Sequence, residues 1–434
     1  MNIRNKILII ISVIAAILAS GCDDESSPRP LDRLPTSITL SLPDDIKTGT
    51  VRDGELTFYN ITTGETTSVL SDSHLIETSI MAGFYNISYQ ASVLLENGIT
   101  ANLRGHADNI AITSSGNLTL DTFCNIENDD LIISEIFFTG TLQASGNSYV
   151  GDSYVKLYNN TDHTVYADGL TFFSSKFITT QKYDYTPDIL PEAMAVDALY
   201  TIPGNGTEHP VEPGQYLLLA DIGIDHRTLN PNSFDLSHAD FEWFDQSTNP
   251  SVTDIDNPDV PNLDKWYCYT QTIFMLHNRG FKAYGIARIP VDRDTYLAGN
   301  VYTYDYINVT QAGTFPMSGQ AYRLDNNWIV DVVNCSVEST YQWNVSTPSL
   351  DAGWTGCGTL ANDKSRFFHA VRRRLLRLEA DGRPVFKDTN NSTADFNAYC
   401  TPSEIELQHS ATDINGTRAT TVTYDGVTPI KTTE

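Results

Sequence analysis

The chain has 434 residues and a formal net charge of −27 at pH 7, although only 19% of its residues are charged. This length is enough for two or three domains with cores of their own. The acidity argues against a nucleic-acid partner, because phosphate binding needs clustered lysine and arginine side chains. With 22 tyrosines and 18 phenylalanines, the composition favours strands over helices.

The N-terminus has the layout of a secretory signal. Arg4 and Lys6 precede an apolar run that ends at Leu18, and small residues then lead to Cys22. The run is short for a membrane span but sufficient for a signal peptide. We therefore expect residues 1–21 to be a signal peptide.

The residues around the expected cleavage point carry a first resemblance. Cys22 after Ala-Ser-Gly resembles the lipobox of bacterial lipoproteins, in which the cysteine is acylated and becomes the first mature residue. The acidic run Asp23–Glu25 resembles the export tag of Bacteroidetes-type surface lipoproteins. These resemblances imply an outer-membrane protein that is anchored through lipid on Cys22 and faces outward. An ordinary signal peptide with a chance cysteine and a merely soluble tether are the alternatives.

A linker and a first β domain are expected next. Residues 22–34 are acidic and contain proline, which keeps a linker extended. Residues 35–126 contain about seven short apolar-alternating segments, a spacing typical of a β-sandwich. Val51–Gly64, followed by Ile80–Gly83 and Tyr85-Asn-Ile-Ser, resembles the transthyretin-like or carboxypeptidase-regulatory type of immunoglobulin-like domain. That resemblance implies that this first domain serves as a spacer.

The stretch Leu131–Leu170 predicts two strands and the start of a third. Apolar residues recur at every second position around Ile133 and again around Tyr154, which is typical of half-buried strands. Ile133-Ser-Glu-Ile, Tyr154–Asn159 and Asp168-Gly-Leu resemble the lamin-tail domain, an immunoglobulin-like β-sandwich. One departure is Lys156, because that family usually carries an acidic residue there.

The resemblance sets the expected domain plan. The known lamin-tail domain is shorter, so residues 127–405 are expected to form an elaborated lamin-tail-like β-sandwich with a long insertion around 221–361. Residues 406–434 are expected to be a threonine-rich strand or tail. The whole chain resembles an uncharacterised family of Bacteroidetes lipoproteins, which are often encoded beside TonB-dependent outer-membrane transporters. The expected fold class is therefore mainly β.

The expected insertion contains the main candidate for a metal site. Carboxylates alternate with other residues between Thr253 and Asp264, and Ca²⁺ takes six to eight oxygen ligands. Asp254, Asp256 and Asp259 are the candidate ligands for Ca²⁺, although the sequence indicates no cofactor that the protein requires. The spacing fits no EF-hand, and the prolines in this segment fit a solvated surface loop equally well.

Three further sets of residues are candidates for sites. His226 and His238, with a neighbouring aspartate, are candidates for a transition-metal site, although their spacing matches no standard pair. Trp243, Trp266 and Tyr267 are candidates for an aromatic ligand platform, or else for sandwich core under the insertion. Arg372–Arg374 is a candidate anion clamp, or else a counter-charge within an acidic protein.

The cysteines suggest one disulfide. If Cys22 carries lipid, five cysteines remain, and export permits disulfides. Cys335 and Cys357 are the preferred pair, because they span a loop with turn-rich ends. The absence of a Cys-x-x-Cys motif disfavours a structural zinc ribbon.

The motifs of common hydrolases are missing from the sequence. It contains neither Gly-x-Ser-x-Gly nor His-Glu-x-x-His, the signatures of serine hydrolases and zinc proteases. The sequence therefore predicts a non-enzymatic surface lipoprotein, an accessory that captures a nutrient or metal-bearing ligand for a TonB-dependent transporter. An adhesive or structural surface lipoprotein and a hydrolase with a carboxylate-based site are the alternatives.

Overall fold

The structure of the chain is a computed structural model that describes residues 33–42, 50–94, 100–125 and 129–408. It divides into two compact units, Met1–Cys124 and Asn125–Glu434, which are considered separately below. The predicted signal peptide, the lipid site at Cys22 and most of the predicted linker and tail lie outside the described residues. Among the described residues, no helix is both long and apolar enough to cross a membrane.

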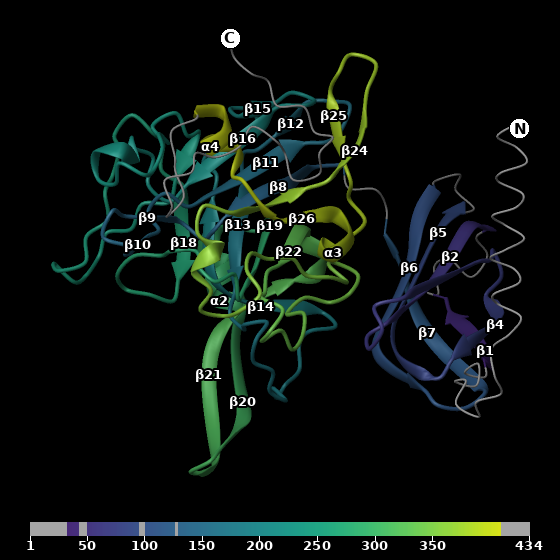
Figure 1. Cartoon of the computed structure of the whole chain (residues 1–434). Helices are drawn as coiled ribbons and strands as arrows, with labels where there is room; N and C mark the ends of the chain where they lie inside the picture. The colour runs from purple at the N-terminus through teal and green to yellow at the C-terminus, as the bar shows by residue number, and fades with distance from the viewer. Residues whose placement is uncertain (1–32, 43–49, 95–99, 126–128, 409–434) are drawn as a thin grey trace, which may run out of the picture. The chain divides into compact units, whose positions relative to one another are not determined.

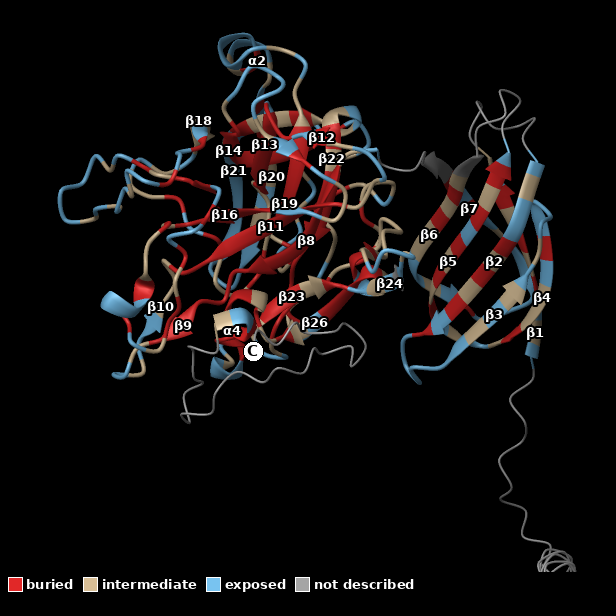
Figure 2. Cartoon of the chain, turned by 90° about the horizontal axis from the view of Figure 1, so that it is seen from above, coloured by how far each residue is buried: buried red, intermediate tan, exposed pale blue. Residues whose placement is uncertain are grey.

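The first unit is a seven-stranded sheet wrapped around one core. The strand order is β3-β2-β5-β6-β7-β1-β4, and β1 pairs in parallel with β7 but antiparallel with β4. Buried side chains alternate along the strands and meet in a single cluster that includes Ile38, Phe58 and Tyr89 (Figure 2). The strands are β1 (Arg33–Ser41), β2 (Thr50–Asn60), β3 (Thr66–Leu70), β4 (Leu75–Met81), β5 (Gly83–Leu94), β6 (Thr100–Ile112) and β7 (Gly116–Asn125). The prediction of about seven short strands here is confirmed.

The second unit is built on two larger sheets (Figure 1). The first has the order β17-β16-β11-β8-β23-β26, and the second has the order β20-β21-β14-β13-β19-β22, with β18 paired to β14. The first sheet contains β8 (Leu131–Phe137), β11 (Tyr154–Asn159), β16 (Tyr216–Ala220), β17 (Phe241–Glu242), β23 (Ala370–Arg373) and β26 (Phe396–Cys400). The second contains β13 (Leu170–Ser175), β14 (Ala193–Thr201), β18 (Asp264–Cys268), β19 (Ala283–Arg288), β20 (Val301–Thr310), β21 (Gly313–Asp325) and β22 (Ile329–Asn334).

Smaller elements complete this unit. Three two-stranded sheets join β9 (Thr141–Leu142) to β10 (Ser148–Tyr149), β12 (Val165–Tyr166) to β15 (Pro210–Val211), and β24 (Leu375–Leu378) to β25 (Pro384–Phe386). The α-helices are α2 (Arg293–Gly299), α3 (Ser392–Asp395) and α4 (Ser403–Gln408). The protein is mainly β, as predicted.

The two large sheets of the second unit enclose the main core. One apolar cluster takes Ile133, Val155 and Leu217 from the first sheet and Phe172 and Tyr284 from the second. Two further clusters lie on the outer faces of the sheets, where long connections and short helices cover them. The central strands are therefore buried on both faces.

This double burial corrects the prediction of half-buried strands. Every residue of β8 and every residue of β11 is buried, including the charged Glu135 and Lys156. The alternation in the sequence is real, but the outer face is covered by residues from distant parts of the chain. Ser403, for example, donates a hydrogen bond to Glu135 across 268 positions.

Candidate functional site

A cavity of about 330 Å³ opens beside β14 and the hairpin formed by β20 and β21. That volume lies at the small end of the range for ligand pockets, roughly 300–1,000 Å³. Its walls come from the segment after β13, from the start of β14, from β20 and from the loop after β22. The lining residues are Phe177, Lys182, Tyr183, Asp184, Tyr185, Asp188, Ile189, Leu190, Ala193, Ala195, Tyr302, Trp343 and Val345.

Aromatic rings form the wall of this pocket. The rings of Phe177 and Tyr185 stack with centroids 3.8 Å apart and an interplanar angle of 16°. Tyr304 meets both rings edge-on, at 5.1 and 5.4 Å, and Trp343 lies 6.3 Å from Tyr185. Such contacts are worth about 0.5–1.5 kcal/mol each beyond the buried area, so the wall is fixed before any ligand arrives.

Main-chain contacts hold the pocket-forming segment against the hairpin. Thr186 and Asp305 exchange two backbone hydrogen bonds of 2.9 Å. The hydroxyl of Tyr302 donates to the carbonyl of Pro187 at 2.7 Å. The indole N–H of Trp343 reaches the carbonyls of Ile178 and Gln181, each at 3.0 Å.

Polar groups without a protein partner stand at the pocket. Within the described residues, the carboxylate of Asp184 and the hydroxyl of Tyr185 have no hydrogen-bond partner, and Lys182 has no carboxylate partner. The ammonium of Lys182 lies 5.7 Å from the Trp343 ring centroid, and Lys182 and Asp184 are both exposed. Burial raises the pKa of Tyr185, with neighbouring tyrosines adding to the effect, so its hydroxyl stays neutral and can donate or accept.

This pocket was not predicted from the sequence, although the sequence contains a signal for it. Tyr302, Tyr304 and Tyr306 occupy every second position of β20 and therefore share one face of the strand. Tyr183 and Tyr185 repeat the pattern in the facing segment. Nothing in the local sequence indicates that these two runs face each other.

The predicted aromatic platform is not formed. Trp243 is completely buried in the main core, where its ring stacks on Phe172 with centroids 5.6 Å apart. Trp266 and Tyr267 pack against a different cluster, on the outer face of the second sheet. The alternative interpretation of Trp243, as core beneath an insertion, is the one that the structure supports.

The predicted calcium ligands are not brought together either. The carboxylate of Asp254 accepts the backbone N–H groups of Asp245 and Ile255 at 2.8 and 3.0 Å. Asp256 accepts from the Asn262 amide at 2.8 Å, and Asp259 is exposed. Among the described residues, the one group of three potential ligands with donor atoms within 4.8 Å lies elsewhere. Backbone N–H groups and the Asn262 amide are the partners that hold these carboxylates in the loop.

That other group consists of Asp168, Glu208 and His209. The carboxylate of Asp168 accepts backbone N–H groups from Gly206, Glu208 and His209 at 2.8–3.1 Å. These hydrogen bonds outweigh the effect of burial and lower the pKa of Asp168. The carboxylate thus holds the turn before β15, and we assign the group a structural role.

The two candidate histidines contact different partners and are not brought together. The ring of His226 is buried, where Nδ1 contacts the Tyr149 hydroxyl at 2.7 Å and Nε2 contacts the Ile222 carbonyl at 2.8 Å. His238 instead contacts the carboxylate of Glu404 at 3.1 Å. His226 is thus part of the buried interior, whereas His238 is half exposed and pairs with Glu404.

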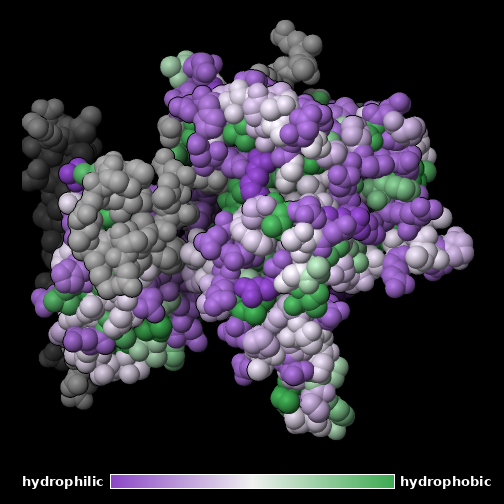
Figure 3. Space-filling model, turned by 180° about the vertical axis from the view of Figure 1, so that it is seen from behind, coloured by the Kyte–Doolittle hydropathy of each residue, from purple (hydrophilic) through white to green (hydrophobic). Residues whose placement is uncertain are grey.

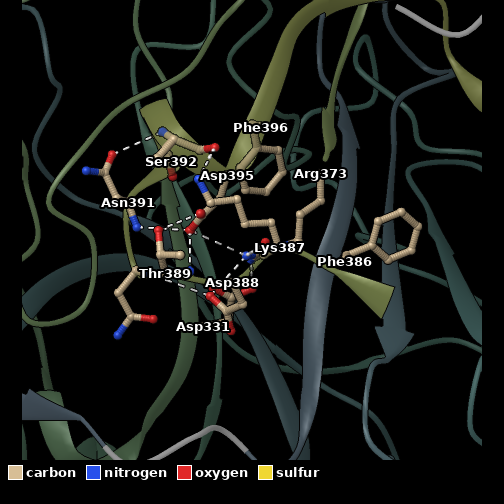
Figure 4. Close-up of polar contacts among 12 residues, drawn as sticks. Asp331, Arg373, Phe386, Lys387, Asp388, Thr389, Asn391, Ser392, Asp395 and Phe396 are labelled. Atoms are coloured by element: carbon tan, nitrogen blue, oxygen red, sulfur yellow. Dashed lines mark hydrogen bonds and ion pairs between the residues drawn. The ribbon is translucent and has the colours of Figure 1, made fainter. Parts of the chain in front are cut away.

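Arg373, the buried member of the arginine cluster, pairs with carboxylates of the protein itself (Figure 4). The side chain of Arg373 is buried and lies 2.6 Å from Asp331 and 3.1 Å from Asp388, with Asp395 at 3.9 Å. Its guanidinium also donates to the carbonyl of Ile133 at 2.8 Å. Arg373 is therefore a counter-charge within the protein, which was the alternative interpretation of this cluster, whereas Arg374 is exposed and donates from Nε to the carbonyl of Phe396 at 3.0 Å.

A second buried network explains Lys156. Its ammonium lies 2.6 Å from Glu404 and donates to the hydroxyl of Ser403 at 2.7 Å. Glu135 accepts from the hydroxyl of Tyr154 at 2.7 Å and from the backbone N–H of Ser403 at 2.8 Å. The lysine therefore docks α4 onto the outer face of the first sheet.

The predicted disulfide is not present. Cys335 and Cys357 are both free and fully buried within the main core. Burial raises the pKa of both thiols, which keeps them protonated. In this setting cysteine behaves as a small apolar residue that fills core space.

Comparisons with known proteins show what this chain is similar to. A family model described as "Protein of unknown function (DUF4876)" matches residues 212–403. A DUF4876 family protein from Bacteroides thetaiotaomicron, of known crystal structure, is 19% identical, with a TM-score of 0.51 over 85% of this chain and 96% of that chain. The chain is thus similar in fold to an uncharacterised Bacteroides protein, in line with the expected resemblance to an uncharacterised Bacteroidetes family.

Two other comparisons add little. A Bacteroides ovatus protein described as a putative adhesin is 9% identical, with 71% of this chain and 88% of that chain covered. Its TM-score of 0.17 is too low to support an argument about fold or function. No curated protein matches the chain.

Proposed function

We propose that this protein is a non-enzymatic, lipid-anchored surface protein that binds a short saccharide in its aromatic pocket. The observation that carries the proposal is the pocket wall, where stacked rings stand beside polar groups that no protein atom uses. Phe177, Tyr185 and Trp343 offer apolar ring faces. Lys182 and Asp184 also line the pocket, where the ammonium of Lys182 can donate hydrogen bonds and the carboxylate of Asp184 can accept them.

The chemistry of a sugar ring matches both features. One face of a pyranose is lined with C–H groups and packs on an aromatic ring, while its hydroxyl edge needs hydrogen-bond partners. An ammonium donates, a carboxylate accepts, and a neutral phenol does either. Binding to a rigid aromatic wall also avoids the entropy cost of ordering flexible side chains.

The expected surface setting supports a role in nutrient capture. The lipobox resemblance at Cys22 supports an anchor in the outer membrane, and the acidic residues after it support the extracellular face. The first unit then serves as a spacer that carries the pocket away from the lipid. We propose that captured ligand passes to a TonB-dependent β-barrel transporter as partner.

Changing the pocket is expected to weaken saccharide binding without unfolding the protein. Asp184→Asn removes an exposed charge that has no protein partner in the described residues, so the melting temperature stays unchanged. Tyr185→Ala removes a ring of the wall, and we expect binding to fall roughly tenfold or more, equivalent to about 1.4 kcal/mol. A glycan microarray followed by titration calorimetry measures both effects.

Tyr166→Ala is the matched control for the pocket variants. Tyr166 is an exposed tyrosine on β12, outside the pocket. Its replacement should leave binding at the wild-type level. If Tyr166→Ala and Tyr185→Ala weaken binding equally, the ligand does not occupy the aromatic pocket.

The transporter partnership has its own test. Affinity capture of the full chain from detergent-solubilised outer membrane should recover a β-barrel transporter. If no such transporter is recovered, the proposed partnership is rejected, but the proposal of saccharide binding is not affected.

A second candidate function rests on the far end of the hairpin. Ile307, Val309 and Phe315 are 52%, 73% and 44% exposed, and Figure 3 shows hydrophobic surface along this projecting hairpin. Exposed apolar patches mark interaction surfaces, which favours an adhesive or structural role. Replacing Val309 and Phe315 with serine should abolish cell adhesion under this alternative and leave saccharide binding unchanged.

A further inference from the structure

The hairpin of β20 and β21 ends in an edge strand. β20 is the outermost strand of the second large sheet, with β21 as its neighbour, and the hairpin projects beyond the rest of the unit (Figure 1). Thr186 covers one point on the outer edge of β20, because it exchanges two backbone hydrogen bonds of 2.9 Å with Asp305. In the part of the chain that the structure describes, no further backbone hydrogen bond joins the 182–187 segment to β20. Beyond Asp305, this edge is therefore open as far as the turn.

The open part of the edge presents the backbone groups of two residues. The N–H and C=O of Asp305 point away from β21, toward Thr186. Successive residues of a strand alternate in direction, so the N–H and C=O groups of Ile307 and Val309 also point outward. The register of β20 with β21 has no shift along its length, so this alternation is unbroken. Unpaired edge groups of this kind are a template for pairing with another chain.

The features that usually protect an exposed edge are missing from this hairpin. The sequence from Tyr306 to Tyr322 contains no charged residue, and its one proline, Pro316, belongs to the inner strand β21. Charged side chains and proline on the edge strand are common means of preventing edge pairing. Ile307 and Val309 are also β-branched, which favours strand pairing. The sequence of this edge is thus well suited to an added strand.

The apolar end of the hairpin fits an added strand better than a lipid surface. Residues that are paired across two strands share a face of the sheet. Ile307 is paired with Pro316 on one face, and Phe315 lies on the other. A lipid layer could cover both faces, but it would leave the outward N–H and C=O groups of Ile307 and Val309 without hydrogen bonds, which is costly. A partner strand satisfies these groups.

We propose that the added strand is β20 of a second copy of this chain. The open segment is centred on Asn308, so antiparallel pairing about a two-fold axis at Asn308 places Ile307 of each copy opposite Val309 of the other. In this register all the outward N–H and C=O groups of both residues are paired. The Asp305 hydrogen bonds limit the contact on one side, and the turn limits it on the other. The edge is therefore complementary to itself.

The charge of the chain also favours contact through this hairpin. Two copies with a net charge of −27 each repel one another, and the repulsion is smallest where neither copy contributes charged side chains. The contact is small, so we expect a weak dimer. Salt screens the repulsion, and dimerisation should therefore strengthen as the ionic strength rises.

The proposed contact is separate from saccharide binding, because Ile307 and Val309 do not line the aromatic pocket. It names a partner for the hairpin surface on which the adhesive alternative rests. Self-association and cell adhesion are measured separately, so the failure of one does not decide the other.

Sedimentation equilibrium of the full chain at rising protein concentration tests for the dimer. We expect a concentration-dependent dimer in the wild type and its loss in Val309→Pro. Proline at this position removes an outward N–H that β21 does not use, so the hairpin is kept, and an unchanged melting temperature checks this. Val309→Lys replaces it if the proline variant does not fold. The control Phe315→Ser removes an exposed apolar side chain from the inner strand and should still dimerise.

Two results of this experiment overturn the proposal. One is a wild type that stays monomeric at every concentration and ionic strength. The other is a Val309→Pro variant that folds and still dimerises. Binding of the wild type to phosphatidylcholine vesicles that is lost in Val309→Pro, without any dimer, assigns the hairpin to lipid and overturns the proposal as well.

Cysteine cross-linking tests the register of the pairing. Directly opposite residues that are not hydrogen-bonded to each other have Cα atoms about 4.5 Å apart in antiparallel strands, within the range of a disulfide. Asn308→Cys should therefore form a disulfide-linked dimer under mild oxidation. Val309→Cys should give no more cross-linked dimer than the wild type, because the two copies of residue 309 are not opposite each other. Equal cross-linking of both variants overturns the proposed pairing.

Discussion

Replacing Arg373 with methionine is expected to lower the free energy of unfolding by about 3–5 kcal/mol, the range for removing one partner of a buried ion pair. The guanidinium is enclosed and faces Asp331, Asp388 and Asp395. Methionine fills much of the same volume but leaves these carboxylates without their cation. Chemical denaturation of the purified protein measures the change.

Position within the fold, rather than the number of partners, determines the size of this effect. Arg227 also faces two carboxylates, Asp225 and Asp235, but its side chain is 45% exposed. Exposed ion pairs contribute about 0–1 kcal/mol, so Arg227→Met should cost no more than that. Equal losses of unfolding free energy for Arg373→Met and Arg227→Met would contradict the idea that burial makes the Arg373 ion pairs more stabilising.

Replacing Lys156 with methionine is expected to destabilise the protein by a similar amount, about 3–5 kcal/mol. The ammonium is the close partner of Glu404, at 2.6 Å, in a site where both side chains are almost fully buried. Without this ammonium, the negative charges of Glu404 on α4 and Glu135 on β8 are left without the cation that lies between them and repel each other. Lys364→Met, at an exposed position, is the control and should change stability by no more than about 0.5 kcal/mol.

The effect of Lys156→Met should depend on pH. Burial favours the neutral form of Glu404, but the charge of Lys156 and hydrogen bonds from His238 and Lys156 outweigh it and lower the pKa of Glu404 from 4.5 to about 2. A lowered carboxyl pKa stabilises the folded state above pH 4.5, and this contribution disappears as the pH falls from 4.5 through 2. The difference between wild type and Lys156→Met should therefore shrink across that range. A difference that stays constant from pH 7 to pH 2 would show that Lys156 acts through packing alone.

The strands could be predicted because their signal is local. Alternation around Ile38, Phe58 and Ile133 follows from the period of a strand, whatever surrounds it. Full burial of β8 could not be predicted in the same way. Its outer face is covered by residues such as Ser403 and Phe234, which lie far away in the sequence.

The sites were harder to predict, because each depends on how distant segments meet. Trp243 lies in a polar insertion, but parallel pairing of β17 with β16 carries it into the core. Asp254, Asp256 and Asp259 lie close together in the sequence, but only the fold determines that their carboxylates do not form one cluster. The pocket likewise joins Tyr185, Tyr302 and Trp343 from three separate segments.

Saturation-transfer difference NMR, with an oligosaccharide that binds on the array, tests the central claim most directly. Irradiation of aromatic protein protons should transfer saturation to the ring C–H protons of the sugar, because these lie against the rings of Phe177, Tyr185 and Trp343. The transfer should fall sharply in Tyr185→Ala and persist at the wild-type level in Tyr166→Ala. Transfer that survives unchanged in Tyr185→Ala, or that no tested oligosaccharide gives, would contradict saccharide binding in the aromatic pocket.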